Sequence, residues 1–157
     1  MMYSSLRIFR KATDSVKMNC WWVFAKCMPA ESLKASSVIS VLMGNQPQRY
    51  QQNLSRECCG ICEDPVYDDS IHVLFDCERL QTLRSSLYDK LLRSMPQALA
   101  SDFSNLSKDD KVILMLSGYG HKYIPEWSEI YVNTANFIDR LYKLRHWAYE
   151  NLPIDNG

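Results

Sequence analysis

Apolar residues recur at intervals of three and four along most of the chain, which is the period of an amphipathic α-helix. In the clearest segment, residues 78–95, the shared apolar face consists of Leu80, Leu83, Leu87 and Leu91. A long last helix is expected over residues 128–151, with one side formed by Ile130, Thr134, Phe137, Leu141, Leu144 and Ala148. The same period predicts shorter helices over residues 3–18, 28–45 and 107–118. Few convincing strands lie outside the cysteine-rich segment, so the chain is predicted to be mostly α.

Residues that begin or end helices flank several of these segments. Ser32 is expected to cap the second helix, and Gly44 to end it. Pro96 follows the leucine-rich helix, and proline cannot continue a helix because it lacks the backbone N–H. Ser107 precedes an acidic residue by three positions, which resembles a capping box and opens a helix that stops at Gly118.

Length and composition limit the class of protein. The chain has 157 residues, of which 46% are hydrophobic, enough for the core of one domain or slightly more. No apolar run approaches the roughly 20 residues that span a bilayer, so no membrane partner is expected. The basic start lacks the apolar segment of a signal peptide. The six cysteines are too few for a disulfide scaffold, so the chain is predicted to be intracellular, either nuclear or cytoplasmic.

Charge is balanced over the whole chain but not along it. Lys and Arg together number 18, as do Asp and Glu, so net charge indicates no partner. The first 26 residues carry five cations against one acid, whereas residues 56–79 carry seven acids against two arginines. The chain therefore opens basic and becomes acidic around its cysteines.

Four cysteines and one histidine lie within twenty residues, and their spacing is typical of a metal site. Cys59, Cys62, His72 and Cys77 form the pattern C-x2-C-x9-H-x4-C. Three thiolates and one imidazole complete a tetrahedral shell around Zn²⁺ and leave no position for water, so the ion is expected to be structural. Thiolate ligands favour zinc over hard cations such as magnesium.

The adjacent Cys58 leaves one ligand open, because Cys58 and Cys62 also make a ligand pair. Cys59 is favoured, since the intervening Gly60 and Ile61 give the tighter turn. The remaining cysteines, Cys20 and Cys27, are predicted to be buried thiols. Disulfide pairing and four separately buried cysteines are the alternatives to a metal site, and both fit the acidic spacer and the intracellular prediction less well.

The segment also contains Tyr67, Asp68 and Asp69, a "YDD" run similar to the active-site turn of reverse transcriptases. Two-metal phosphoryl transfer needs a further carboxylate on a neighbouring strand and a shaped cleft. The two aspartates instead fall in the spacer between predicted zinc ligands. They are expected to form an exposed turn without catalytic chemistry.

Residues 59–91 resemble the zinc-binding segment that follows the polymerase domain in non-long-terminal-repeat retrotransposon reverse transcriptases. The resemblance rests on the paired cysteines, an acidic spacer, a histidine followed by apolar residues and a last cysteine. It implies the same four ligands, and it matches a following helix marked by Leu83 and Arg84. The chain lacks the polymerase palm and the endonuclease motif of that family. We therefore expect a detached or co-opted C-terminal piece and no enzyme.

In that family this region is implied to help bind RNA or DNA. Phosphate contacts need Lys and Arg, which the acidic knuckle itself mostly lacks. The cations expected to carry such contacts are Arg7, Arg10, Lys11, Lys17, Arg49, Arg56 and Arg84. The alternative is that these residues form a solvated face.

The remaining histidines are assigned no chemistry: His121 lies in an expected loop, and His146 lies near the end of the last helix. The aromatic residues near the end of the chain, among them Trp147, are expected to pack the core or a partner surface.

Together these features predict a helical domain built around one small CCHC zinc knuckle, with at most a short β-hairpin. The expected parts are a basic helical lead-in and connector over 1–55, the knuckle and its helix over 56–96, and a C-terminal helical region over 97–157, forming one compact unit. The predicted function is a nucleic-acid-binding or scaffolding module with structural Zn²⁺ and no small-molecule substrate. The alternative is a zinc-stabilised protein-interaction module without nucleic-acid affinity.

Overall fold

The computed structural model describes residues 20–42, 61–62, 70–121 and 124–151. Nearly all of these residues are helical, and no strand occurs among them, so the prediction of a mostly α fold is confirmed. The helix predicted over residues 3–18 and the end predicted at Gly44 lie outside the described residues.

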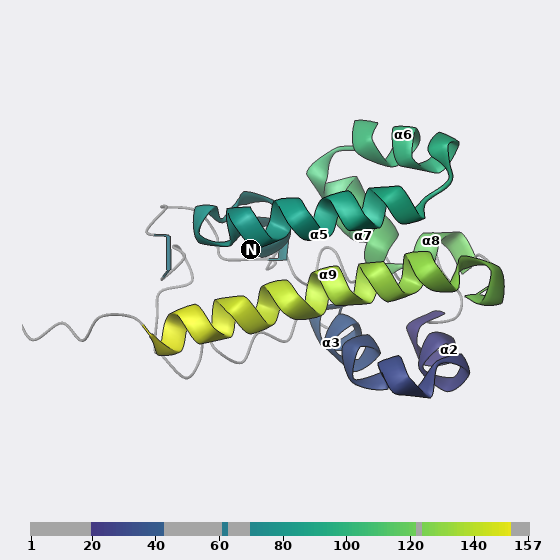
Figure 1. The fold of residues 1–157 in the computed structure, drawn as a ribbon, viewed down its shortest axis with the longest axis horizontal. Helices are drawn as coiled ribbons and strands as arrows, with labels where there is room; N and C mark the ends of the chain where they lie inside the picture. The colour runs from purple at the N-terminus through teal and green to yellow at the C-terminus, as the bar shows by residue number, and fades with distance from the viewer. Residues whose placement is uncertain (1–19, 43–60, 63–69, 122–123, 152–157) are drawn as a thin grey trace, which may run out of the picture.

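The longest helix, α9 (Ile124–Glu150), organises the others (Figure 1). It runs along the long axis, with α5 (Gln81–Ser94) beside it on one side. On another side it contacts α2 (Cys20–Cys27) and α3 (Ser32–Leu42). Because two layers cover α9, it needs more than the single apolar stripe that periodicity predicts.

The aromatic contacts of α9 assign one stripe to each layer. Tyr131 packs against Trp21 and Phe24 of α2, with ring centroids 5.3 and 5.7 Å away. Phe137 instead meets Phe75 and Tyr88 on the opposite layer, at 6.0 and 6.3 Å. The predicted stripe through Phe137 is therefore joined by a second one through Tyr131, and these two rings are fully buried.

Shorter helices complete the fold around α5. A 3₁₀ turn over Glu78–Leu80 leads directly into α5, so the helix predicted over 78–95 is confirmed. Two helices then follow, α6 (Gln97–Asn105) and α7 (Lys108–Leu116). The Ser107 side chain accepts a hydrogen bond of 3.2 Å from the Asp110 N–H, as the capping pattern predicts. Helix α6 was not expected from the sequence, and Phe103 is its one fully buried residue.

The second predicted helix begins differently from the expectation. A 3₁₀ turn over Pro29–Glu31 leads straight into α3, and Ser32 has helical backbone angles. Ser32 is therefore not an N-cap, because a capping residue keeps an extended backbone and bonds forward with its side chain. Pro29 begins the turn instead, which suits proline because its missing N–H has no partner at that position anyway.

The turn after α7 requires glycine. Gly118, which begins the short helix α8 (Gly118–His121), has φ +73°, a left-handed conformation that side chains disfavour. A Cβ added there would lie 2.6 Å from the Cβ of Cys20, too close for real atoms. The Gly118 carbonyl accepts a hydrogen bond of 2.5 Å from the Tyr131 hydroxyl, which ties the turn to α9. His121 thus ends a helix rather than lying in a loop.

Candidate metal centre

Three of the four predicted ligands come together in the structure. One ligand atom from each of Cys62, His72 and Cys77 lies within 4.8 Å of the other two, close enough to hold one metal ion. His72 and Cys77 are buried, and Cys62 is partly exposed. The group therefore lies at the edge of the core rather than on the open surface.

A wide helical turn brings His72 and Cys77 together. The two residues are five positions apart, which in an α-helix would separate them by about 140° around the axis. Residues His72–Asp76 instead form a π-helical turn, η2, and the Cys77 N–H donates to the His72 carbonyl at 2.7 Å. This i→i+5 bond places the second residue close above the first. The four-residue gap between histidine and cysteine is therefore the spacing that such a turn requires.

The distance between two of the ligand atoms suits a tetrahedral ion. The Cys62 Sγ lies 3.3 Å from the His72 Nε2. Zinc bonds of about 2.3 Å to sulfur and 2.0–2.1 Å to nitrogen, at a tetrahedral angle, place such atoms roughly 3.6 Å apart. The Nε2 atom is thus the histidine nitrogen that faces the ion position. Two thiolates and an imidazole are a donor set that zinc prefers.

The fourth ligand lies outside the described residues. Cys59, its alternative Cys58 and the spacer with Asp68 and Asp69 all fall there. The structure therefore supports a metal-binding group of three residues. The full CCHC shell and the identity of the ion stay predictions.

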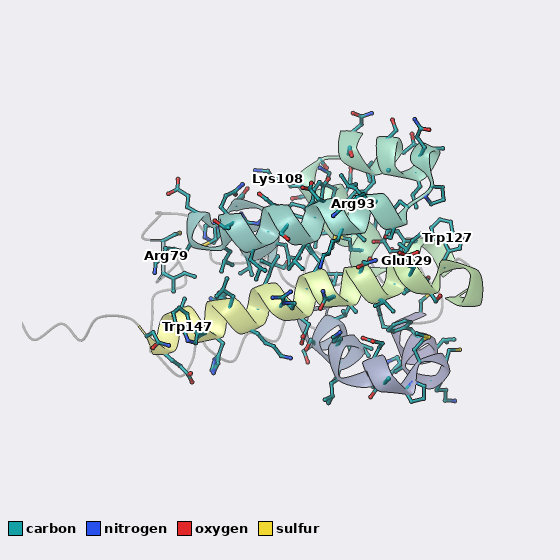
Figure 2. The ribbon with its side chains drawn as sticks, in the orientation of Figure 1. Arg79, Arg93, Lys108, Trp127, Glu129 and Trp147 are labelled. Carbon is teal, nitrogen blue, oxygen red and sulfur yellow. The ribbon has the colours of Figure 1, made fainter. Side chains whose placement is uncertain are left out.

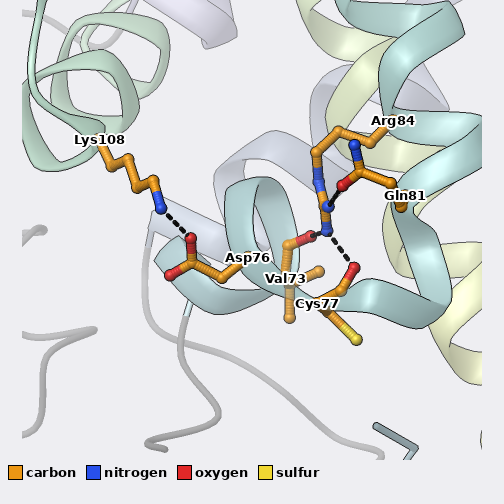
Figure 3. Close-up of polar contacts among 6 residues, drawn as sticks. All are labelled: Val73, Asp76, Cys77, Gln81, Arg84 and Lys108. Carbon is orange, nitrogen blue, oxygen red and sulfur yellow. Dashed lines mark hydrogen bonds and ion pairs between the residues drawn. The ribbon is translucent and has the colours of Figure 1, made fainter.

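Arg84 does not have the role that the sequence suggested. It was expected to contact phosphate, but its side chain is buried and directed at the ligand-bearing turn (Figure 3). The Nη2 atom donates to the carbonyl oxygens of Val73 and Cys77, at 3.0 and 2.9 Å. The Nη1 atom donates to the Gln81 Oε1 at 2.9 Å. Arg84 therefore joins α5 to both ends of the η2 turn, and its guanidinium is not available to nucleic acid.

The surroundings of Arg84 stabilise the positive charge of its buried guanidinium. Burial lowers the pKa of the guanidinium, while the nearby Cys77 and Asp76 raise it and oppose the effect of burial. A buried cation is costly unless it is paired and hydrogen-bonded. The two carbonyl oxygens and the adjacent negative groups supply that compensation, so the charge stays at the metal-binding turn.

Helix α7 holds the outer side of the same turn. Lys108 forms an ion pair with Asp76, the residue just before the ligand Cys77 (Figure 3). One turn further, the Lys111 ammonium lies 5.4 Å from the ring centroid of Tyr88 and 5.8 Å from those of Phe75 and Phe103. These distances are within the range of cation–π attraction. The ring of Phe75 belongs to η2 itself, so α7 contacts the metal-binding turn at two successive residues.

The other residues singled out in the sequence divide into two groups. The first, outside the described residues, consists of Arg7, Arg10, Lys11, Lys17, Arg49 and Arg56. The second group lies within the described residues and includes the remaining cysteines. Cys20 is buried as predicted, but Cys27 is exposed. Cys27 is the last residue of α2, whose core contacts are made by Cys20, Trp21 and Phe24 nearer its start.

Comparison with known proteins does not extend this description. No protein-family model matches the chain, and neither curated proteins nor solved structures give a significant match. The resemblance of residues 59–91 to the zinc-binding segment of retrotransposon reverse transcriptases therefore stays a prediction. Among the described helices, none combines the length and the hydrophobicity that spanning a bilayer requires.

Proposed function

We propose that this chain is a zinc-organised helical module that binds nucleic acid or serves as a scaffold, derived from the C-terminal region of a retrotransposon reverse transcriptase. The observation that carries the proposal is the convergence of Cys62, His72 and Cys77 at the edge of the core. With Cys59 as fourth ligand, the shell is closed and the ion structural. No catalytic step is proposed.

Zinc would have a defined mechanical role in this fold. Its ligands lie on two segments, Ile61–Cys62 and the η2 turn with Cys77, which the acidic spacer separates along the chain. Burial of Ile61 in the core already places the first segment near the second, and zinc would join them directly. The η2 turn contacts both α5 and α9. Fixing the turn therefore orients the start of α5 against α9. Structural zinc contributes on the order of 10 kcal/mol of apparent binding energy, so its removal would loosen this end of the molecule.

Nucleic-acid binding is supported by cations on the described surface as well as by the resemblance. Arg84 is excluded by its burial, but exposed cations occur on the elements around the metal group. They are Arg79, Lys90, Arg93, Lys108, Arg140 and Lys143. The affinity for nucleic acid increases with the number of cations that contact phosphates, and it falls as the salt concentration rises.

A protein-interaction module is the second candidate, and a different observation favours it. Trp22 and Leu33 are 62% and 82% exposed on α2 and α3. Contiguous exposed apolar patches mark surfaces that bind other proteins, and Trp22 and Leu33 are the large apolar side chains that such a patch on α2 and α3 would use. On this view zinc is structural and nucleic acid does not bind.

A salt titration separates the two candidates. The zinc-loaded full chain is mixed with fluorescently labelled single-stranded RNA, single-stranded DNA and duplex DNA, and anisotropy is followed from low to physiological salt. The nucleic-acid proposal predicts saturable binding whose logarithm falls linearly with the logarithm of the salt concentration. Absence of binding to all three probes at low salt would overturn it and leave the protein-interaction module.

A further inference from the structure

From Asn133 onward, one face of α9 presents polar, cationic and aromatic side chains without an acid, and the exposed Glu129 lies on the same face one turn earlier. The residues at i, i+3 and i+4 spacing on this face are Asn133, Asn136, Arg140, Lys143, Trp147 and Asn151. At 3.6 residues per turn they fall within an arc of about 80°, and they extend over about 27 Å. All six are at least partly exposed, in contrast to the two buried stripes of the same helix.

The cations on this face remain accessible despite an ion pair. Arg140 is exposed, and the Lys143 side chain is 73% exposed although its ammonium lies 3.0 Å from Asp139. The Asp139 carboxylate is itself buried and accepts a second hydrogen bond, 2.7 Å from the Ser37 hydroxyl. Beyond the face, Glu150 is held by His146 at 2.8 Å. Asp139 is thus paired within the fold and Glu150 is paired with His146, while Arg140 and Lys143 remain exposed. Glu129 lies near the N-terminal end of α9, away from Trp147.

Trp147 is the aromatic side chain on this face. Its side chain is 57% exposed and projects from the C-terminal part of α9 (Figure 2), whereas the next residue, Ala148, packs in the core. An exposed indole beside cations is the combination that binds single-stranded nucleic acid: every base has a ring face for stacking, and phosphates pair with the cations. In a duplex the bases are already stacked. A contiguous apolar patch would favour a protein partner, but the neighbours of Trp147 on this face are polar or charged.

We infer that single-stranded nucleic acid binds along the face of α9 formed by Arg140, Lys143 and Trp147. Arg140 and Lys143 contact successive phosphates, and Trp147 stacks on a base. Arg79 extends the positive charge, since it follows the metal ligand Cys77 and lies at the same end of the molecule as Trp147 (Figure 2). This inference rests on the proposed function and specifies the surface that carries it.

The test compares variants of the zinc-loaded full chain by anisotropy with labelled oligouridine and oligothymidine. Trp147→Ala is expected to weaken binding by about tenfold, and Trp147→Phe to recover most of the loss because it keeps a stacking ring. Trp22→Ala, which removes the exposed tryptophan of α2, is the matched control and is expected to bind as the wild type does. Equal losses in Trp147→Phe and Trp147→Ala would contradict a stacking role.

A second pair of variants tests the cations. Arg140→Gln combined with Lys143→Gln is expected to reduce the salt slope of binding by about 1.4, the value for two phosphate contacts on a single strand. Lys26→Gln combined with Lys34→Gln makes the same change of net charge on α2 and α3 and is expected to reduce the slope by less than half as much.

The outcomes separate this inference from the proposed function. If the wild type binds but the α9 variants match their controls, the α9 surface is wrong and nucleic-acid binding survives. If the wild type binds none of the probes at low salt, the nucleic-acid function and the surface fail together. Preferential binding of oligouridine or of oligothymidine identifies RNA or DNA as the ligand.

Discussion

The guanidinium of Arg84 donates a hydrogen bond of 2.9 Å to the carbonyl oxygen of Cys77, a predicted metal ligand. A second bond from the same nitrogen reaches the carbonyl of Val73, next to the ligand His72. One side chain of α5 therefore fixes the backbone at or beside two predicted ligands (Figure 3). This arrangement makes the metal group and helix α5 a single unit.

Arg84→Met should destabilise the zinc-loaded protein by about 2–3 kcal/mol. The apolar side chain fills similar space but leaves the carbonyls of Val73 and Cys77 without their donor, and hydrogen bonds from charged groups contribute at this level. Urea unfolding followed by circular dichroism measures the change. Arg84→Lys should recover only part of the loss, because one ammonium cannot reproduce the three bonds of the fork.

Arg93→Met is the control for this prediction, since Arg93 is exposed on the same helix. Its effect should stay within about 0.5 kcal/mol, as for other surface substitutions. If Arg84→Met and Arg93→Met unfold at the same urea concentration, Arg84 does not hold the turn.

Lys111→Met should lower the free energy of unfolding by about 1–2 kcal/mol, because the ammonium loses its attraction to three aromatic rings. For a chain of this size that corresponds to a fall in Tm of roughly 2–8 °C, measurable by calorimetry. Lys108→Met removes the exposed ion pair with Asp76 and should change stability by less than about 1 kcal/mol. If Lys108→Met lowered the free energy of unfolding more than Lys111→Met, the ion pair with Asp76 would contribute more than the cation–π contacts, which contradicts this prediction.

Stability should decline above pH 10 because of the buried Tyr119 and Tyr131. Burial raises the pKa of both hydroxyls above the ordinary value of 10.0. Since their pKa values are higher in the folded state, the contribution is complete below pH 10 and is lost as the pH rises towards the folded values. Each tyrosine should lower the free energy of unfolding by up to about 1.4 kcal/mol per pH unit in that range.

Tyr119→Phe isolates this effect. At neutral pH the variant should be about 1 kcal/mol less stable, because Tyr119 and Thr134 share a hydrogen bond of 2.5 Å. The difference from the wild type should shrink above pH 10, since phenylalanine does not titrate. Urea unfolding at several alkaline pH values measures it, and a constant difference would exclude the raised pKa.

Periodicity and cap chemistry predict much of this fold because they are local. The leucines of α5, the Ser107 cap and the ligand spacing of Cys62, His72 and Cys77 can all be recognised from neighbouring residues. Helix α6 was missed because it is short and buries only Phe103 completely, although Leu99 and Ala100 lie on the same face and pack against the core.

Long-range packing explains the remaining differences. Hydrophobicity assigns Leu144 to the core, but the structure buries Arg145 completely and Leu144 only partly. Arg84 was likewise expected at the surface, because arginine is almost never fully buried unless it is paired. Its partners are carbonyl groups of the π-helical turn, and a sequence pattern does not reveal where such carbonyls point.

The choice between adjacent cysteines gives a further prediction. Cys59→Ser should abolish stoichiometric zinc binding, because it removes one of four ligands, whereas Cys58→Ser should retain it. Substituting cobalt for zinc and recording its thiolate charge-transfer absorbance tests both variants under reducing conditions. The opposite result would make Cys58 the ligand.

The most direct test of the central claim is native mass spectrometry of the reduced full chain, with circular dichroism recorded before and after a chelator. A structural zinc held by Cys62, His72, Cys77 and a fourth cysteine predicts one bound ion per chain, lost to the chelator together with part of the helical signal. A chain that carries no metal as purified, takes up no added zinc and keeps its full helical signal would contradict the account.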